Sequence, residues 1–130
     1  MSGKRIESVE IMAYGTLMQG EPNHHLLANS RFLGEASTAP EFTLVNMGAY
    51  PAMVEDGTTA VKGEVYEVNA ITLAELDSLE GAPVFYKRRM ITLANGRRVI
   101  AYIMMPQKRT MGRPVIEHGD WRRHRKELGQ

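Results

Sequence analysis

Alternating apolar and polar positions divide most of the chain into short strands. Between Ala60 and Val68, apolar residues alternate with Lys62, Glu64 and Glu67. This period of two predicts a strand with one buried face and one face in water. Further strands are predicted over residues 9–13, 32–38, 42–47, 86–93 and 97–104, and a turn within residues 48–54 feeds another short strand. Asn95-Gly96 is a strong hairpin signal between the last two long strands.

Three short helices are predicted between and after these strands. In the middle one, Thr72 and Glu75 match a capping box, and Gly81 suits the position that ends a helix. This helix is predicted over about residues 73–80. The other two are predicted from Pro22, which suits a first helical turn, through Ala28, and from Gly119-Asp120-Trp121 through Lys126.

The order of these elements predicts the fold class. Strands outnumber helices, most connections are short, and no regular βαβ alternation is present, so the class is α+β. We expect a mostly antiparallel sheet or small β-barrel flanked by short helices. The 130 residues contain no evident linker or internal repeat, so one domain over residues 1–130 is predicted.

Composition narrows the function classes. The chain has 16 Lys and Arg against 15 Asp and Glu, a balance that argues against nucleic acid or an anionic membrane as the main partner. It has no cysteine, and its adjacent His24 and His25 cannot share one helical face as metal ligands, so no metal site is expected. The amino-terminal residues do not resemble a signal peptide, and no apolar run reaches about 18 residues, so a cytoplasmic location is expected.

Glu80 is a carboxylate on the apolar side of a predicted helix, where a charged side chain is unexpected. With about 100° of rotation per residue, Glu80 falls between Leu73 and Leu76 on the apolar side of the middle helix. Partial burial and the helix C-terminus both disfavour its charged form, and both should raise its pKa. Such a group suits proton transfer. The alternative is a structural role, in which Glu80 turns outward at the helix end or pairs with Arg88 or Arg89.

A glycine-bearing loop follows the first strand and offers a candidate binding site. It consists of Tyr14, Gly15, Thr16 and Leu17. Gly15 permits a positive φ and a close approach of the backbone to a ligand. Successive backbone N–H groups in such a turn can bind an anion, for example a ligand carboxylate. The alternative is an ordinary turn from strand to loop, with Tyr14 in the core.

These segments, taken in order, resemble the γ-glutamylcyclotransferase-like family. Tyr14 to Leu17 resembles its Y-G-[ST]-L signature, and Gly63 to Tyr66 resembles its G-E-V-Y strand. Leu76-Asp77-x-x-Glu80-Gly81, followed by Tyr86-Lys87-Arg88, resembles its L-D-x-x-E and Y-x-R segment. Pro22-Asn23-His24 looks like the γ-glutamylamine cyclotransferase branch, and the tail around Trp121 looks like small bacterial members. The resemblance covers about residues 9 to 105.

The resemblance implies a fold, a reaction and roles for individual residues. The implied fold is a small β-barrel with peripheral helices, often called BtrG-like. In the implied reaction, the α-amine of a γ-glutamylamine or γ-glutamyl amino acid attacks its own γ-carbonyl, which yields 5-oxoproline and releases the amine. Glu80 would be the general acid/base, the loop from Tyr14 to Leu17 would hold the α-carboxylate, and Tyr86 and Tyr50 would border the pocket. No metal or organic cofactor is implied.

Two other functions remain open at this stage. The chain could be a catalytically idle binding module of the same fold that recognises a small carboxylate ligand or a protein partner. It could instead be a nucleic-acid accessory protein that uses the basic run from Arg122 to Lys126. The presence of Glu80 favours the enzyme over the binding module, and the balanced net charge disfavours the third function.

Overall fold

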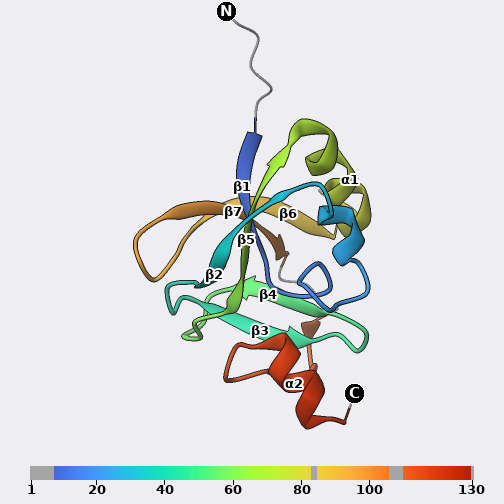
Figure 1. Cartoon of the computed structure of the whole chain (residues 1–130). Coiled ribbons are helices and arrows are strands. Elements are labelled where there is room, and N and C mark those ends of the chain that lie inside the picture. The colour runs from blue at the N-terminus through green and yellow to red at the C-terminus, as the bar shows by residue number, and fades with distance from the viewer. Residues whose placement is uncertain (1–7, 83–84, 106–109, 130) are drawn as a thin grey trace, which may run out of the picture.

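The computed structural model describes residues 8–82, 85–105 and 110–129. Strands predominate, and the helices are short (Figure 1). The strands are β1 (Ser8–Ala13), β2 (Arg31–Ser37), β3 (Phe42–Asn46), β4 (Pro51–Glu55), β5 (Lys62–Asn69), β6 (Tyr86–Thr92) and β7 (Arg98–Met104). The helices are η1 (His24–Leu27, a single 3₁₀ turn), α1 (Ala70–Glu80) and α2 (Trp121–Glu127).

Five of these strands form one curled sheet in the order β2-β5-β1-β7-β6. Its pairs are antiparallel except for β1 and β7, which run parallel. The two edges of the sheet meet at one end, because the Ala39 amide donates to the Thr92 carbonyl at 2.9 Å and the Ala94 amide donates to the Ser37 carbonyl at 2.8 Å. The predicted α+β class is confirmed, with strands arranged as a mixed sheet that closes on itself at this end.

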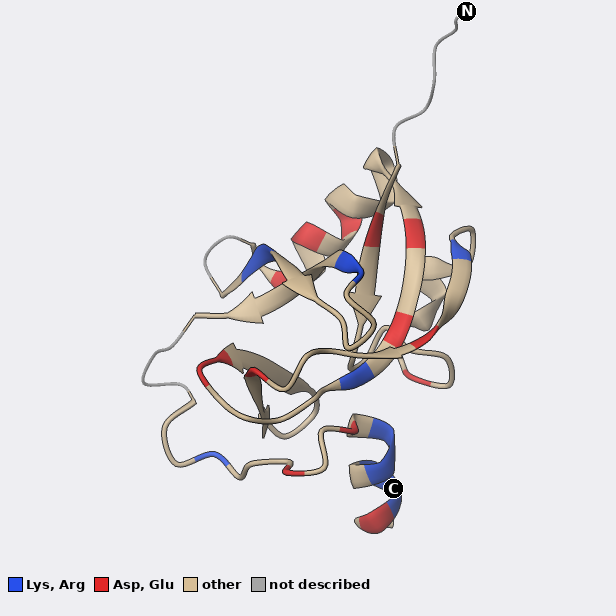
Figure 2. Cartoon of the chain, turned by 90° about the vertical axis from the view of Figure 1, so that its left-hand side faces the viewer, with Lys and Arg blue, Asp and Glu red and all other residues tan. Residues whose placement is uncertain are grey.

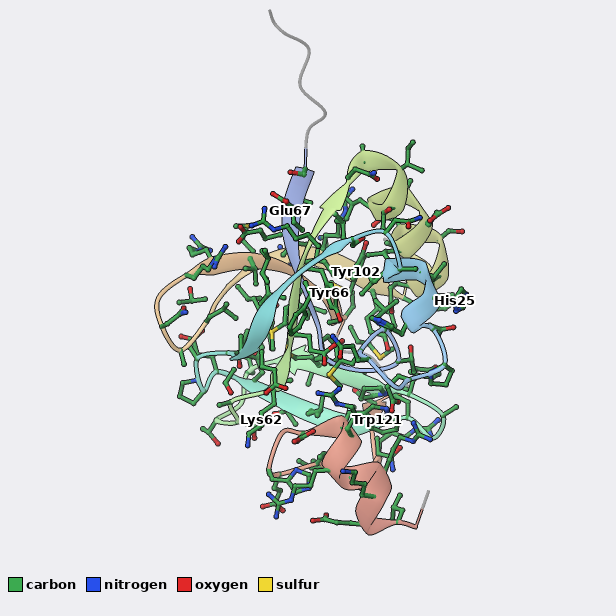
Figure 3. All side chains as sticks on the ribbon, in the orientation of Figure 1. His25, Lys62, Tyr66, Glu67, Tyr102 and Trp121 are labelled. Carbon is green, nitrogen blue, oxygen red and sulfur yellow. The ribbon has the colours of Figure 1, made fainter. Side chains whose placement is uncertain are left out.

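The hairpin of β3 and β4 forms a second, two-stranded sheet below the first, between it and α2 (Figure 1). Its Leu44 and Met53 are fully buried. Large side chains of the five-stranded sheet complete the same core, and Tyr66 and Tyr102 point into the interior while His25 and Lys62 lie at the periphery (Figure 3). Burial of such side chains is the main favourable term in folding.

The start of α1 differs from the prediction. The helix begins at Ala70, and its cap is Asn69, whose Oδ1 accepts a hydrogen bond from the Thr72 amide at 2.8 Å. The predicted capping box at Thr72 is therefore wrong, because Asn69 already satisfies this amide and the helix starts one turn earlier. The predicted end is confirmed, since Gly81 ends the helix with a left-handed φ of 64°.

Three other local predictions can be compared directly. The hairpin at Asn95-Gly96 is confirmed, and Gly96 has the positive φ that the turn requires. The final helix is also confirmed, and it begins at Trp121 with Asp120 as its cap. The helix predicted from Pro22 is confirmed only as the four-residue turn η1.

Candidate active site

A cavity of about 580 Å³ opens between the loop after β1, the turn before β4, the end of α1, the start of β6 and the end of β7. The structure places every residue singled out from the sequence on its wall. These residues are Glu80, Tyr14, Gly15, Thr16, Leu17, Tyr50 and Tyr86. Residues more than 60 positions apart in the chain therefore meet around one space large enough for a small molecule.

Glu80 ends α1 and lies at the wall of this cavity. Part of its surface remains open to the cavity, but the surrounding protein removes most of its water. Burial raises the pKa of the Glu80 carboxyl to about 7. No described residue makes a hydrogen bond or ion pair with this carboxyl group, so burial acts without compensation.

The alternative pairing of Glu80 with an arginine is not what the structure shows. Arg88 instead contacts Asp77, one helical turn before Glu80, with 3.2 Å between Arg88 Nε and Asp77 Oδ1. The side chains of Leu73 and Leu76 lie toward the core, and Leu76 is fully buried. Glu80 thus follows the apolar side of α1, as the helical periodicity predicts, rather than turning outward to solvent.

Three buried tyrosines, Tyr14, Tyr86 and Tyr102, share the cavity wall with Glu80. The Tyr14 hydroxyl donates to the Tyr102 carbonyl at 2.7 Å and accepts from the Met53 amide at 3.1 Å. The Tyr86 hydroxyl donates to the Pro51 carbonyl at 3.1 Å. Burial raises the pKa of Tyr14 well above its usual value, with Tyr86 and Glu80 adding to the effect. The side chains of Tyr14 and Tyr86 thus belong to the buried core as well as to the cavity wall.

Tyr102 is a tyrosine of the cavity wall that the sequence did not single out. It is buried on β7, and its hydroxyl donates to Asp77 Oδ1 at 2.6 Å. Burial raises the pKa of Tyr102, and the hydrogen bond to Asp77 raises it further. A lone tyrosine in an apolar strand usually requires a polar partner for its hydroxyl, and this rule is the signal that could have singled it out.

Gly15 is needed for a reason other than the predicted one. Its φ is not positive, so backbone conformation does not require glycine there. A Cβ on Gly15 would instead lie 2.7 Å from Cγ and Cδ of Pro51. The loop can pass this close to the turn before β4 only without a side chain at this position.

The loop from Tyr14 to Leu17 on the cavity wall carries backbone amides that are not used within the described fold. Within the described residues, the amides of Gly15, Thr16 and Leu17 donate to no protein acceptor. The loop is held by bonds at its other groups, such as the Asn23 amide to the Thr16 carbonyl at 2.9 Å and Asn23 Nδ2 to Thr16 Oγ1 at 3.0 Å. An anion can therefore be bound here by an ordered backbone.

The C-terminal helix α2 contacts the residues that directly follow this loop, Gln19 and Glu21. Basic residues gather on α2 at one end of the molecule (Figure 2). Arg122 Nη1 contacts Glu64 Oε2 at 2.9 Å and the Gln19 carbonyl at 3.0 Å. Arg125 Nη1 contacts both carboxylate oxygens of Glu21, at 2.7 and 2.6 Å. Two cations of the basic run are thus used within the fold.

The described residues hold neither a cluster of metal-ligand side chains nor a long apolar helix. No group of three or more His, Asp or Glu side chains there is placed to hold a metal ion. No helix among those residues is both long and apolar enough to cross a bilayer.

Comparison with known proteins identifies the class to which this fold and cavity belong. Residues 11–123 match the family model described as "Gamma-glutamyl cyclotransferase, AIG2-like". The chain belongs to this family, which confirms the resemblance noted in its motifs.

Individual relatives agree with the family match. A protein of Vibrio cholerae serotype O1, whose name provisionally assigns it as a gamma-glutamylcyclotransferase, is 44% identical over 85% of this chain and 93% of its own length. The solution structure of YtfP from Escherichia coli has a TM-score of 0.66 at 37% identity and covers 86% of this chain and 95% of that one. An AIG2-like protein from mouse has a TM-score of 0.71 at 26% identity, with 88% of each chain covered.

Proposed function

We propose that this protein cyclises γ-glutamyl compounds to 5-oxoproline and releases the amine, with Glu80 as the general acid/base. The observation that carries the proposal is the isolated Glu80 carboxyl on the wall of a cavity of about 580 Å³. Its position, its raised pKa and the family of the chain all point to the same reaction.

The proton transfers that the reaction needs suit a carboxyl of this kind. An α-amine ordinarily has a pKa of about 7.7–8.0, so near neutral pH it must lose a proton before it can attack. Glu80, with a pKa of about 7, can accept this proton at little cost because the two pKa values are close. As the lactam forms, the attacking nitrogen loses a second proton, which passes to solvent or to the released amine. As the bond between the carbonyl carbon and the leaving nitrogen breaks, Glu80 returns the first proton to that nitrogen.

The loop after β1 is the proposed anchor for the substrate. The amides of Gly15, Thr16 and Leu17, which have no acceptor among the described residues, would donate to the α-carboxylate. The reaction is already intramolecular, so the main task of binding is to hold the γ-glutamyl chain bent with its amine near its carbonyl. A rigid loop opposite Glu80 serves this purpose, and the same donors can stabilise a developing oxyanion.

The mouth of the cavity is the proposed place for the leaving amine. Tyr50, Leu79 and Phe85 lie on the wall and remain about two-fifths exposed, at 41, 42 and 40%. Their side chains offer apolar contact to the first atoms of an amine and no charge to pair with. This arrangement is compatible with a γ-glutamylamine, the substrate class expected from the Pro22-Asn23-His24 segment.

A substrate panel tests the proposal. The protein is incubated with γ-glutamyl-ε-lysine, γ-glutamyl-alanine and glutathione, and 5-oxoproline is measured by mass spectrometry. Formation of 5-oxoproline together with an equal amount of amine from at least one compound is the expected result. Glu75→Gln is the matched control, because it removes an exposed carboxylate of the same helix, and it should keep the activity. Absence of turnover on every γ-glutamyl compound would reject the enzyme and favour a binding module of the same fold.

A further inference from the structure

Each of the three tyrosine hydroxyls on the cavity wall donates its proton to an acceptor other than Glu80. Two of them donate to backbone carbonyls, Tyr14 to that of Tyr102 and Tyr86 to that of Pro51. The third, that of Tyr102, donates to the carboxylate of Asp77 at 2.6 Å. A phenol has one proton to donate, so none of these hydroxyls is left to donate to Glu80.

Asp77 is the one side-chain acceptor in this set, and it lies on the same helix as Glu80. Residues three apart on a helix are neighbours on its surface, so Asp77 lies beside Glu80, and both Glu80 and Tyr102 line the cavity. Arg88 Nε lies 3.2 Å from Asp77 Oδ1. This contact places a cation beside the same Asp77 oxygen that accepts from the Tyr102 hydroxyl, and charge-assisted hydrogen bonds of this kind are the stronger ones.

We propose that Asp77 is a positioning residue that holds the Tyr102 hydroxyl away from Glu80 and so leaves the Glu80 carboxyl without a hydrogen-bond donor. The inference rests on the proposed function of Glu80 as the proton-transfer group. A hydrogen bond from a phenol would favour the charged carboxylate and make it a weaker base. In this account, Asp77 keeps Glu80 a good proton acceptor without touching the substrate.

The other charged groups near α1 have different partners. The helix packs against β5 and η1. On η1, His24 Nδ1 contacts the Leu17 carbonyl at 2.9 Å and His25 is exposed. On β5, Glu64 is paired with Arg122, Glu67 lies 3.8 Å from Arg31, and Lys62 is exposed at the far end. The remaining charged side chains nearby, Glu75 on α1 and Arg89 on β6, are exposed, and Lys87 on β6 is partly exposed. Among the described residues, none of these charged side chains makes a hydrogen bond or ion pair with Glu80.

The test measures the titration midpoint of Glu80 directly, by ¹³C NMR of its carboxyl carbon, and also the acid limb of the pH profile of kcat/KM. In Asp77→Ala, the freed Tyr102 hydroxyl can donate to Glu80, and both midpoints should fall by about one pH unit, the usual effect of one such bond. Asp77→Asn keeps an acceptor oxygen while removing the charge, so its midpoint should stay close to that of the wild type. In the double variant Asp77→Ala/Tyr102→Phe the donor is absent, and the midpoint should return to the wild-type value.

Two results would overturn the proposal. The first is an unchanged midpoint in Asp77→Ala. The second is a lowered midpoint that persists in the double variant, since the cause would then be lost charge or a displaced Arg88 rather than the hydroxyl. If Asp77→Ala does not fold, Asp77→Ser, whose side chain is also too short to reach the hydroxyl, takes its place. The NMR titration needs no turnover, so failure of this inference is distinguishable from failure of the proposed reaction.

Discussion

Replacing Arg122 with Met should destabilise the protein through the buried carboxylate that Arg122 contacts. The Glu64 side chain is 2% exposed, and Arg122 Nη1 lies 2.9 Å from its Oε2. Breaking a fully buried ion pair from one side typically costs about 3–5 kcal/mol. Here the cost should be nearer to about 2 kcal/mol, because Arg122 is 33% exposed and Glu64 keeps hydrogen bonds from the Gln19 amide and the Tyr66 hydroxyl.

Thermal and urea unfolding, followed by circular dichroism, measure this loss. For a chain of this size, about 2 kcal/mol corresponds to a fall in Tm of roughly 6–8 °C. Arg123→Met is the matched control, because Arg123 is 56% exposed and its partner Glu127 is also exposed, so its Tm should stay close to wild type. Equal Tm values for the two variants would refute the claim that Arg122 is held by a buried carboxylate. The Arg122 variant should also show a raised KM, because Arg122 holds the Gln19 carbonyl, two residues after Leu17 on the cavity wall.

Three further predictions concern the loop, the pH dependence of stability and the helix cap. Gly15→Ala would place Cβ 2.7 Å from the Pro51 ring, so it should cost about 1–3 kcal/mol and raise KM; a wild-type Tm and KM would argue against this packing. The folded protein keeps the Glu80 proton up to about pH 7 while the unfolded chain releases it near 4.5, so the free energy of unfolding should fall as pH rises through this window. Glu80→Gln should remove that fall, which is at most about 3 kcal/mol, and urea titrations at pH 4 and pH 8 measure it. Asn69→Ala should lower the free energy of unfolding by about 1 kcal/mol, while Thr72→Ala should have little effect. A lower Tm for Thr72→Ala than for Asn69→Ala would instead indicate that Thr72 caps the helix.

Local signals along the sequence were sufficient for most of the secondary structure. The Asn95-Gly96 hairpin and the end of α1 at Gly81 depend on backbone conformations that few other residues adopt, so short motifs determine them. The start of α1 was misplaced because Asn69 and Thr72 are both good caps, and only the backbone shows which one is used. The parallel pairing of β1 with β7 joins residues about 90 positions apart and has no local signature.

Some features of the candidate site could likewise be predicted from the sequence, and others depend on tertiary packing. Glu80 could be singled out because its side of the helix follows from periodicity alone. The contact of Gly15 with Pro51 and the hydrogen bond of Tyr102 with Asp77 could not, because they depend on how distant segments pack. The basic run of α2 has no periodicity that indicates a partner. Its ion pairs, Arg122 with Glu64 and Arg125 with Glu21, appear only in the tertiary structure.

The rate of 5-oxoproline formation by the wild type and by Glu80→Gln, measured from pH 5 to pH 9 on the best γ-glutamyl substrate, tests the central claim most directly. Wild-type kcat/KM should fall on the acid side with a midpoint near pH 7, where Glu80 becomes protonated. Glu80→Gln, correctly folded by circular dichroism, should lose activity by about 100-fold or more at every pH. A Glu80→Gln variant with the wild-type rate and the same pH profile would contradict the role of Glu80 as the proton-transfer group.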